Sequence, residues 1–207
     1  FGLMLAVARN IVSTNRWVHE GRWQTAIGVD VCGKTLGLMG FGAIAKNVAR
    51  RASGFGMKVL AYDPYVKELP EEFQSYVTLC GENEVISGCD FLSLHLPLND
   101  ETRNMISAPQ LASMKAGAYV INAARGGIVN EKDLYEALVS GHIAGAAMDV
   151  SEVEPMAEEN PLRTLDNVII TPHIGMYSKE AIGAVSLICA QNVAACAAGA
   201  ELKFQVV

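Results

Sequence analysis

The chain has 207 residues, of which 51% are hydrophobic and 18% charged, and it carries a formal net charge of −6. This length and composition are typical of a globular protein with one large core. The acidic balance and the lack of any block of Lys or Arg argue against nucleic acid or an anionic membrane surface as the main partner.

From residue 34 onward, short apolar runs of strand type alternate with helical stretches, and a further helix is expected over 3–12. The expected strands cover 34–40, 57–63, 90–96, 118–124, 143–150 and 167–174. The expected helices cover 43–55, 82–88, 107–114, 130–140 and 178–198. Such alternation predicts parallel strands joined by crossover helices, and strands that are apolar on both faces need helices on both sides. We therefore expect an α/β fold with a doubly wound, mostly parallel sheet.

This pattern divides the chain into three parts. Residues 1–30 form an N-terminal helix and arm, 31–177 a Rossmann-type nucleotide-binding domain, and 178–207 a C-terminal helix and tail. The longest polar stretch, 151–166, is interpreted as a surface loop, and loops of this kind often carry functional residues.

Two features of the chain bear on membranes and on metals. Residues 181–200 carry no charge and reach the length of a membrane span, but Gln191 and Asn192 lie at the centre and the apolar residues follow helical spacing. We interpret this segment as a buried amphipathic helix and expect no membrane partner. The five cysteines form no CxxC pair and leave an odd one, so we expect no zinc site, no disulfide framework and a reducing cytoplasm.

Two glycine motifs compete as phosphate sites. Residues 28–35, GVDVCGKT, fit the nucleoside-triphosphate loop G-x-x-x-x-G-K-[ST]. That loop requires a strand before its first glycine and a helix that opens at the Lys-Thr pair. Residues 21–27 make a poor strand, and the glycines of 36–42 oppose a helix. A P-loop nucleotidase is therefore the weaker interpretation.

The second motif, Gly40-Phe-Gly42-Ala-Ile-Ala45, follows an expected strand and opens an expected helix, and Asp63 closes the next strand. This is the dinucleotide-binding arrangement. Gly40 permits the tight turn, Gly42 lets backbone amides approach a pyrophosphate, and Ala45 keeps the helix close to the sheet. Asp63 would bind a ribose diol and repel a 2′-phosphate, which favours NAD over NADP. The alternative is a plain strand-to-helix turn, with Asp63 capping the loop before Pro64.

Five stretches resemble one family. They are SGFGMKVLAYDPY, LHLPLNDETRNMI, INAARGGIVNEKDLYEAL, AAMDVSEVEP and TPHIG. In this order they are similar to the D-isomer-specific 2-hydroxyacid dehydrogenases, most closely to phosphoglycerate dehydrogenase and its relatives. The resemblance covers essentially the whole chain and implies an NAD-dependent oxidoreductase that acts on a D-2-hydroxy acid or 2-keto acid.

The resemblance also implies roles for individual residues. The catalytic set would be Arg125, Glu154 and His173. Ala43 and Ile44 would contact the pyrophosphate of the cofactor, and Asp63 the adenosine ribose. Leu96 and Pro97 would lie on the adenine side. Ala123, Asp149 and Gly175 would lie around the nicotinamide.

The chemistry agrees with these three catalytic roles. Reduction of a 2-keto acid puts negative charge on the carbonyl oxygen, so a proton donor and a fixed cation are wanted there. His173 can donate the proton, Glu154 can orient its ring, and Arg125 can hold the carboxylate in a forked geometry. Each of the three also has a plain structural interpretation: His173 as a histidine at the end of a strand, Glu154 as a surface charge, and Arg125 as a solvated loop residue. Three other histidines are assigned no catalytic role: His95 is expected to be structural, and His19 and His142 to lie on the surface.

The family pattern sets expectations beyond the site. Helix 3–12 and the arm 16–23 would form a homodimer contact, and helix 178–198 would pack on a separate substrate domain that lies outside these residues. The chain alone should therefore bind NAD(H) and turn over weakly or not at all. An alternative in the same superfamily is an NAD(H)-sensing co-repressor, which keeps the same Arg, Glu and His.

Overall fold

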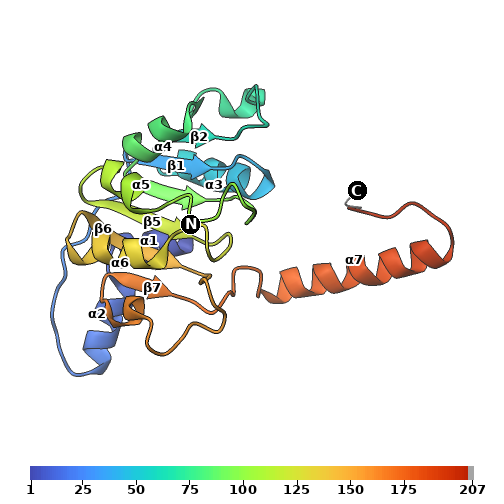
Figure 1. Cartoon of the computed structure of the whole chain (residues 1–207). Coiled ribbons are helices and arrows are strands. Elements are labelled where there is room, and N and C mark those ends of the chain that lie inside the picture. Colours follow the sequence, from blue (N-terminus) through green and yellow to red (C-terminus); the bar gives the residue numbers. More distant parts are fainter. Residues whose placement is uncertain (205–207) are drawn as a thin grey trace. The chain divides into compact units, whose positions relative to one another are not determined.

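The computed structural model describes residues 1–204, and the chain divides into two compact units, Phe1–Pro172 and the segment that begins at His173. The first unit contains the whole sheet (Figure 1). The second contains one long helix.

Within residues 1–204, seven strands form one sheet in the order β3-β2-β1-β4-β5-β6-β7, and every neighbouring pair is parallel. The strands are β1 (Thr35–Met39), β2 (Lys58–Tyr62), β3 (Val77–Leu79), β4 (Phe91–Leu94), β5 (Ala118–Asn122), β6 (Ile143–Met148) and β7 (Val168–Ile170). The chain winds outward from β1 through β2 to β3, and then returns to the other side of β1 with β4. The expectation of a doubly wound α/β sheet is confirmed. The edge strand β3 was not predicted, because three residues are too few to show a pattern.

Helices pack on both faces of this sheet. They are α1 (Gly2–Ala8), α2 (Ile11–His19), α3 (Ala43–Gly54), α4 (Glu82–Gly88), α5 (Ala108–Ser113) and α6 (Glu131–Val139), with short 3-10 turns η1 (Glu71–Phe73) and η2 (Pro161–Thr164). One core lies between the sheet and α1 and α3, and a second lies between the sheet and α4, α5 and α6. Leu38 belongs to the first core and its neighbour Met39 to the second, as side chains that alternate across a strand require.

The prediction of one helix over 3–12 is wrong. The chain breaks into α1 and α2 at Asn10, whose φ is 53°, and the side-chain amide of Asn10 donates to the carbonyl of Ile27 at 3.2 Å. Asparagine tolerates this left-handed conformation better than most residues, so an apolar pattern alone does not reveal the break.

The triphosphate-loop interpretation of residues 28–35 lacks its structural context. The stretch 22–31 forms no strand in the part of the chain that is described, and Thr35 begins β1 rather than a helix. The lysine and threonine of that motif therefore lead into the sheet.

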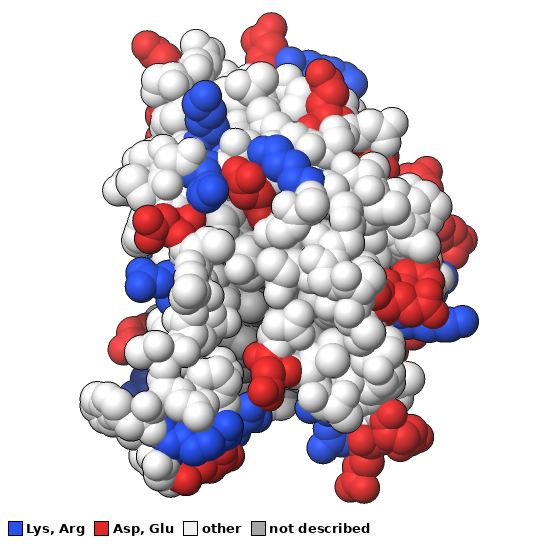
Figure 2. Space-filling model, turned by 90° about the vertical axis from the view of Figure 1, so that its left-hand side faces the viewer, with Lys and Arg blue, Asp and Glu red and all other residues white. Residues whose placement is uncertain are grey.

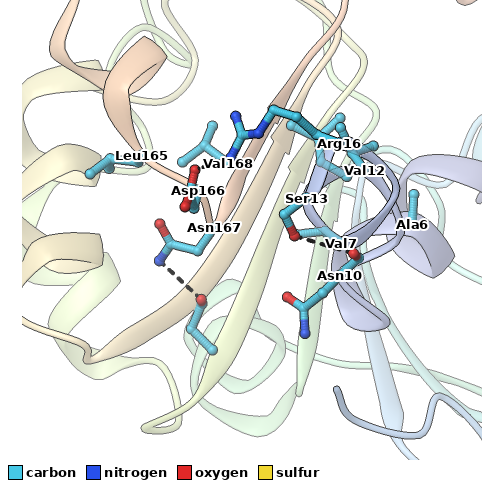
Figure 3. A pocket seen from close by; sticks show the side chains of 12 residues that line it. Ala6, Val7, Asn10, Val12, Ser13, Arg16, Leu165, Asp166, Asn167 and Val168 are labelled. Carbon is cyan, nitrogen blue, oxygen red and sulfur yellow. Dashed lines mark hydrogen bonds and ion pairs between the residues drawn. The ribbon is translucent and has the colours of Figure 1, made fainter. Parts of the chain in front are cut away.

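A small cavity of about 50 Å³ lies where α1 and α2 meet the loop before β7 (Figure 3). The Arg16 guanidinium pairs with the Asp166 carboxylate across it, and the Asn167 side chain donates to the carbonyl of Ala144 at 3.1 Å. Residues 144 and 165–168 lie at the amino ends of β6 and β7. This cavity is therefore at the opposite edge of the sheet from the turn after β1, and it is too small for a nucleotide.

Charges of both signs are interspersed on the face that Figure 2 shows. Blue and red side chains alternate there around a mostly uncharged centre. That face therefore has no continuous basic patch of the kind that binds a phosphate backbone.

The second unit contains α7 (Lys179–Ala197). Its N-cap is Ser178, whose hydroxyl accepts the N–H of Ala181 at 3.0 Å. The prediction of an amphipathic helix is wrong, because its apolar residues are spread around all sides. Residues 1–204 bury none of them, so packing on a separate domain stays a prediction for α7. By length and composition it is the one described helix apolar enough to cross a membrane. A helix packed inside a globular core meets the same criterion, so this evidence is weak.

Candidate functional site

The turn after β1 is built around Gly40. Its φ is 91°, and a Cβ added there would lie 2.6 Å from the carbonyl oxygen of His95. The Gly40 N–H donates to the carbonyl of Tyr62 at 2.7 Å. The turn is thus fastened to the ends of β2 and β4 at once, and only glycine allows both the backbone angle and the close approach.

Gly42 marks the start of α3 and faces open space. It is the N-cap of the helix, and a Cβ added there would meet nothing within 4 Å. Ala43 and Ile44 in the first turn are exposed, while Ala45 is fully buried against the sheet. The start of α3 therefore offers main-chain N–H groups and the positive end of the helix dipole to an anion.

Asp63 lies directly after β2 and holds two main-chain amides. Its Oδ2 accepts the N–H of Phe41 at 2.8 Å, and its Oδ1 accepts the N–H of Tyr65 at 2.9 Å. The second bond caps the loop at Pro64, as the alternative interpretation expected. The first bond ties Asp63 to the glycine turn itself, which the sequence did not indicate.

An open cavity of about 530 Å³ adjoins this turn. Its walls come from the start of α3 and from the segments that follow β4 and β5; they are Ile44, His95, Leu96, Pro97, Leu98, Ala123, Ala124 and Arg125. The strand order reverses between β1 and β4, and ligands of doubly wound sheets bind at the carboxyl ends of the strands at such a point. Five of the expected site residues line this one cavity: Ile44, Leu96, Pro97, Ala123 and Arg125.

His95 lies just past the end of β4, with its Nε2 3.0 Å from the Ser93 hydroxyl. Burial lowers the pKa of His95 to about 4. The ring is therefore neutral near pH 7 and contributes a hydrogen-bonded wall rather than a charge. His19 is exposed, as expected, but His142 is partly buried and its Nε2 has no hydrogen-bond partner among residues 1–204, so the expectation of a surface residue is wrong there.

Arg125 lies in a loop that Asn122 holds from below. Asn122 ends β5 and is fully buried; its amide donates to the carbonyl of Arg125 at 2.9 Å and accepts the N–H of Ala124 at 3.1 Å. The exposed Arg125 guanidinium donates to the carbonyl of Ala124 at 2.7 Å. Asn122 is not among the site residues expected from the sequence, although an asparagine at the end of an apolar strand is a signal for such a turn.

Gly126 brings the Arg125 loop against the loop that carries Glu154. A Cβ added to Gly126 would lie 1.8 Å from the carbonyl oxygen of Ser151 and 2.9 Å from the amide nitrogen of Glu152. These two backbones are therefore in direct contact, and any side chain at 126 would force them apart.

Glu154 is exposed, and its Oε1 accepts the N–H of Ser151 at 3.2 Å. The buried Asp149 follows β6; its Oδ1 accepts the Thr171 hydroxyl at 2.5 Å, and its N–H donates to the carbonyl of Asn122 at 2.8 Å. The ends of β5 and β6 are thereby joined beneath the two loops.

Glu131, at the start of α6, is a second residue that is not expected at the site from the sequence. Only 8% of it is exposed. Its carboxylate accepts the N–H of Glu152 at 2.7 Å and the side-chain amide of Asn160 at 2.6 Å. In the sequence it looks like any acidic residue in the first turn of a helix.

The remaining expected residues, His173 and Gly175, belong to the second unit. His173 begins that unit with a φ of 54°, in the left-handed region. Among residues 1–204, no group of three or more His, Cys, Asp or Glu side chains is arranged to hold a metal ion.

Comparison with known proteins gives consistent similarities. A family model described as D-isomer specific 2-hydroxyacid dehydrogenase, NAD binding domain, matches residues 1–175. A D-3-phosphoglycerate dehydrogenase of Methanocaldococcus jannaschii is 44% identical over 93% of the chain and 37% of its own length. A hydroxypyruvate reductase of Thermotoga maritima is 47% identical over 87% of the chain and 59% of its own length.

Solved structures give the same result. A D-lactate dehydrogenase with NAD+ from Lactobacillus jensenii superimposes with a TM-score of 0.87 at 32% identity, over 100% of the chain and 66% of that structure. The chain thus spans less than two thirds of the length of the two curated relatives above.

Gly126→Ala should destabilise the protein by more than about 2 kcal/mol, because the added methyl group cannot fit against the Ser151 carbonyl. Gly42→Ala is the matched control: its methyl group enters open space and should change the free energy of unfolding by less than about 0.5 kcal/mol. Urea unfolding followed by circular dichroism measures both. Equal stability of the two variants would contradict the contact between the loops.

Proposed function

Because the chain belongs to the family of NAD-binding domains of the D-isomer-specific 2-hydroxyacid dehydrogenases, we propose that it binds NAD(H) and supplies the catalytic residues of a dehydrogenase acting on a D-2-hydroxy acid or 2-keto acid. The family resemblance drawn from the sequence motifs is confirmed. The observation that carries the proposal is the cavity at the carboxyl ends of the strands, which has the start of α3 on one side and Arg125 on another.

The residues around the glycine turn fit the cofactor. Gly40 and Gly42 with Ala43 and Ile44 would hold the pyrophosphate, since the main chain is open there and an added Cβ at Gly42 meets no protein atom. Asp63 would accept hydrogen bonds from the ribose diol through lone pairs that its two amide partners leave free. Its negative charge disfavours a 2′-phosphate, so NAD is preferred over NADP.

The remaining cofactor contacts follow the family pattern. Leu96 and Pro97, which line the cavity, would flank the adenine. Ala123, Asp149 and Gly175 would surround the nicotinamide. When bound, the cofactor supplies or accepts the hydride of the reaction.

Three side chains carry the substrate chemistry in this proposal. Arg125 pairs its guanidinium with the substrate carboxylate and carbonyl, a two-point contact that fixes the substrate orientation. His173 donates a proton to the carbonyl oxygen during reduction and accepts it back during oxidation. Glu154 favours the protonated, correctly oriented ring of His173.

The substrate is proposed only as a class. Relatives at similar identity are named D-3-phosphoglycerate dehydrogenase, glyoxylate reductase and hydroxypyruvate reductase. The substrates in these names have different side chains, but each is a 2-hydroxy or 2-keto acid. These relatives are enzymes, and no observation on the described residues favours the co-repressor alternative.

We also propose a homodimer and a second domain. Exposed apolar residues gather on α2 and the arm after it: Ile11, Val12, Val18, Trp23 and Ile27. Trp23 and Ile27 are 90% and 99% exposed, which is costly unless a partner covers them. A separate substrate domain would account for the length of the relatives, and the cytoplasm remains the proposed location.

NADH should bind this 207-residue chain, and Gly42→Ala should weaken that binding about tenfold or more, because its methyl group would stand where the pyrophosphate approaches the main chain. Titration of NADH fluorescence measures both dissociation constants. The chain alone should oxidise NADH slowly or not at all when a 2-keto acid is added. No binding by the wild-type chain, or rapid turnover by it, would contradict the proposal.

Asp63→Ser should reduce the preference for NADH over NADPH about tenfold or more, because the charge that repels the 2′-phosphate is removed. Serine can still accept one of the two main-chain amides, so the turn should persist. The ratio of the two dissociation constants is the readout. An unchanged ratio would remove the proposed role of Asp63.

In the full-length protein, Arg125→Lys and His173→Ala should each lower kcat/KM for a 2-keto acid about 100-fold or more, since lysine cannot make the forked contact and alanine has no proton to give. The dissociation constant for NADH should change little. Steady-state kinetics across a panel of 2-keto acids tests this. Activities of both variants within about twofold of the wild type would show that the catalytic assignment is wrong.

A further inference from the structure

The loop that carries Glu154 is held at two places, by the loop that carries Arg125 and by the first residue of α6. We call residues 123–127 the arginine loop and residues 151–160 the acid loop. Their backbones touch where Gly126 meets the Ser151 carbonyl. The position of Arg125 relative to Glu154 therefore depends on this backbone contact.

Glu131 provides the second attachment of the acid loop, from a position that lines neither the cavity nor the exposed surface. It lies four residues after the arginine loop and is 8% exposed. Its Oε1 accepts the N–H of Glu152, at the beginning of the acid loop, and its Oε2 accepts the side-chain amide of Asn160, at the end of that loop. One carboxylate thus holds both ends of the acid loop.

The bond between Glu131 and Asn160 has a fixed direction. Asn160 Oδ1 accepts the N–H of Leu162 at 3.0 Å and so caps η2. The Asn160 amide group therefore presents its nitrogen to Glu131, and turning the amide round would lose the cap. Only an acceptor at position 131 satisfies this nitrogen.

A return bond strengthens this attachment. The N–H of Glu131 donates to the Glu152 carboxylate at 3.3 Å, so residues 131 and 152 bond reciprocally, main chain to side chain in both directions. Glu131 is fixed in turn by α6, whose first turn is capped by Asn130 accepting the N–H of Asp133 at 3.0 Å. The acid loop is therefore attached to a helix as well as to the arginine loop.

We propose that Glu131 is a positioning residue of the dehydrogenase reaction, which holds the acid loop in register with the arginine loop and so aligns Glu154 with Arg125. This inference rests on the function proposed above. Alignment of this kind matters because misplacement of a reacting group by about 1 Å can cost about 100-fold in rate. Groups that orient a catalytic residue by hydrogen bonds are worth a substantial part of such a loss.

The test uses an exchange of the two bonding partners in the full-length protein. Glu131→Gln keeps the size of the side chain but replaces one acceptor oxygen with an NH2 group, so it can accept from the Glu152 N–H or from the Asn160 amide but not from both. Asn160→Asp puts a carboxylate against the Glu131 carboxylate. The double variant E131Q/N160D restores one donor and one acceptor in the reverse sense, and the new carboxylate at position 160 can still cap Leu162. Glu136→Gln, the same change at an exposed site of α6, is the matched control.

We expect each single variant to lower kcat/KM for the 2-keto acid about tenfold, while the dissociation constant for NADH stays within about twofold, because the glycine turn is untouched. The double variant should recover to within about threefold of the wild type, and E136Q should match the wild type. Amide hydrogen exchange should rise at Glu152 in the single variants and fall again in the double variant.

Several outcomes would overturn the positioning role. It fails if the single variants lower the unfolding midpoint but keep kcat/KM per folded molecule, or if the double variant regains stability without activity. If E131Q does not fold, N160D carries the same comparison from the loop side. A wild-type protein that reduces no 2-keto acid would overturn the proposed function itself, which this series distinguishes from a failure confined to Glu131.

Discussion

The carbonyl oxygen of His95 lies so close to Gly40 that no side chain fits between the turn after β1 and the end of β4. This contact is possible because β1 and β4 are parallel neighbours, so their carboxyl ends lie side by side. The strand order reverses at the same point, which places the connecting helices on opposite faces of the sheet. The two loops beyond β5 and β6 then line up along the same edge. Every residue of the first unit that is assigned to the cofactor or the substrate lies at or beyond that edge of the sheet.

Features of the fold and the site could be predicted when neighbouring residues in the sequence determine them. The central strands were predicted because they are apolar on both faces, and the glycine turn because its spacing is fixed by phosphate geometry. The break at Asn10 depends on a backbone angle, and Glu131 depends on bonds to residues 21 and 29 positions later. Neither leaves a periodic trace, so the sequence could not indicate them. Asn122 was within reach, since a buried amide at the end of a strand implies a turn.

For α7 the error is the opposite one, because helical spacing of apolar residues was taken to indicate one distinct apolar face. Small and apolar residues satisfy helical spacing on every side of α7, so a stripe could be drawn through them although no one face is distinct. A stripe has meaning only when the remaining positions are polar. The arginine and acid loops were predicted for their charged side chains, whereas the groups that hold them are buried or are glycines.

Asp63 is part of the scaffold, since it binds the amides of Phe41 and Tyr65, and in the proposed function it is also the charge that discriminates between coenzymes. A lineage that replaces Asp63 to adopt a phosphorylated coenzyme loses at least one of these two amide bonds together with the charge. Adaptation therefore has to pass through forms with a looser turn, unless a compensating acceptor arises first. Coenzyme choice in this fold is in this way coupled to backbone order, and a change of coenzyme should favour a later second substitution that replaces the lost acceptor.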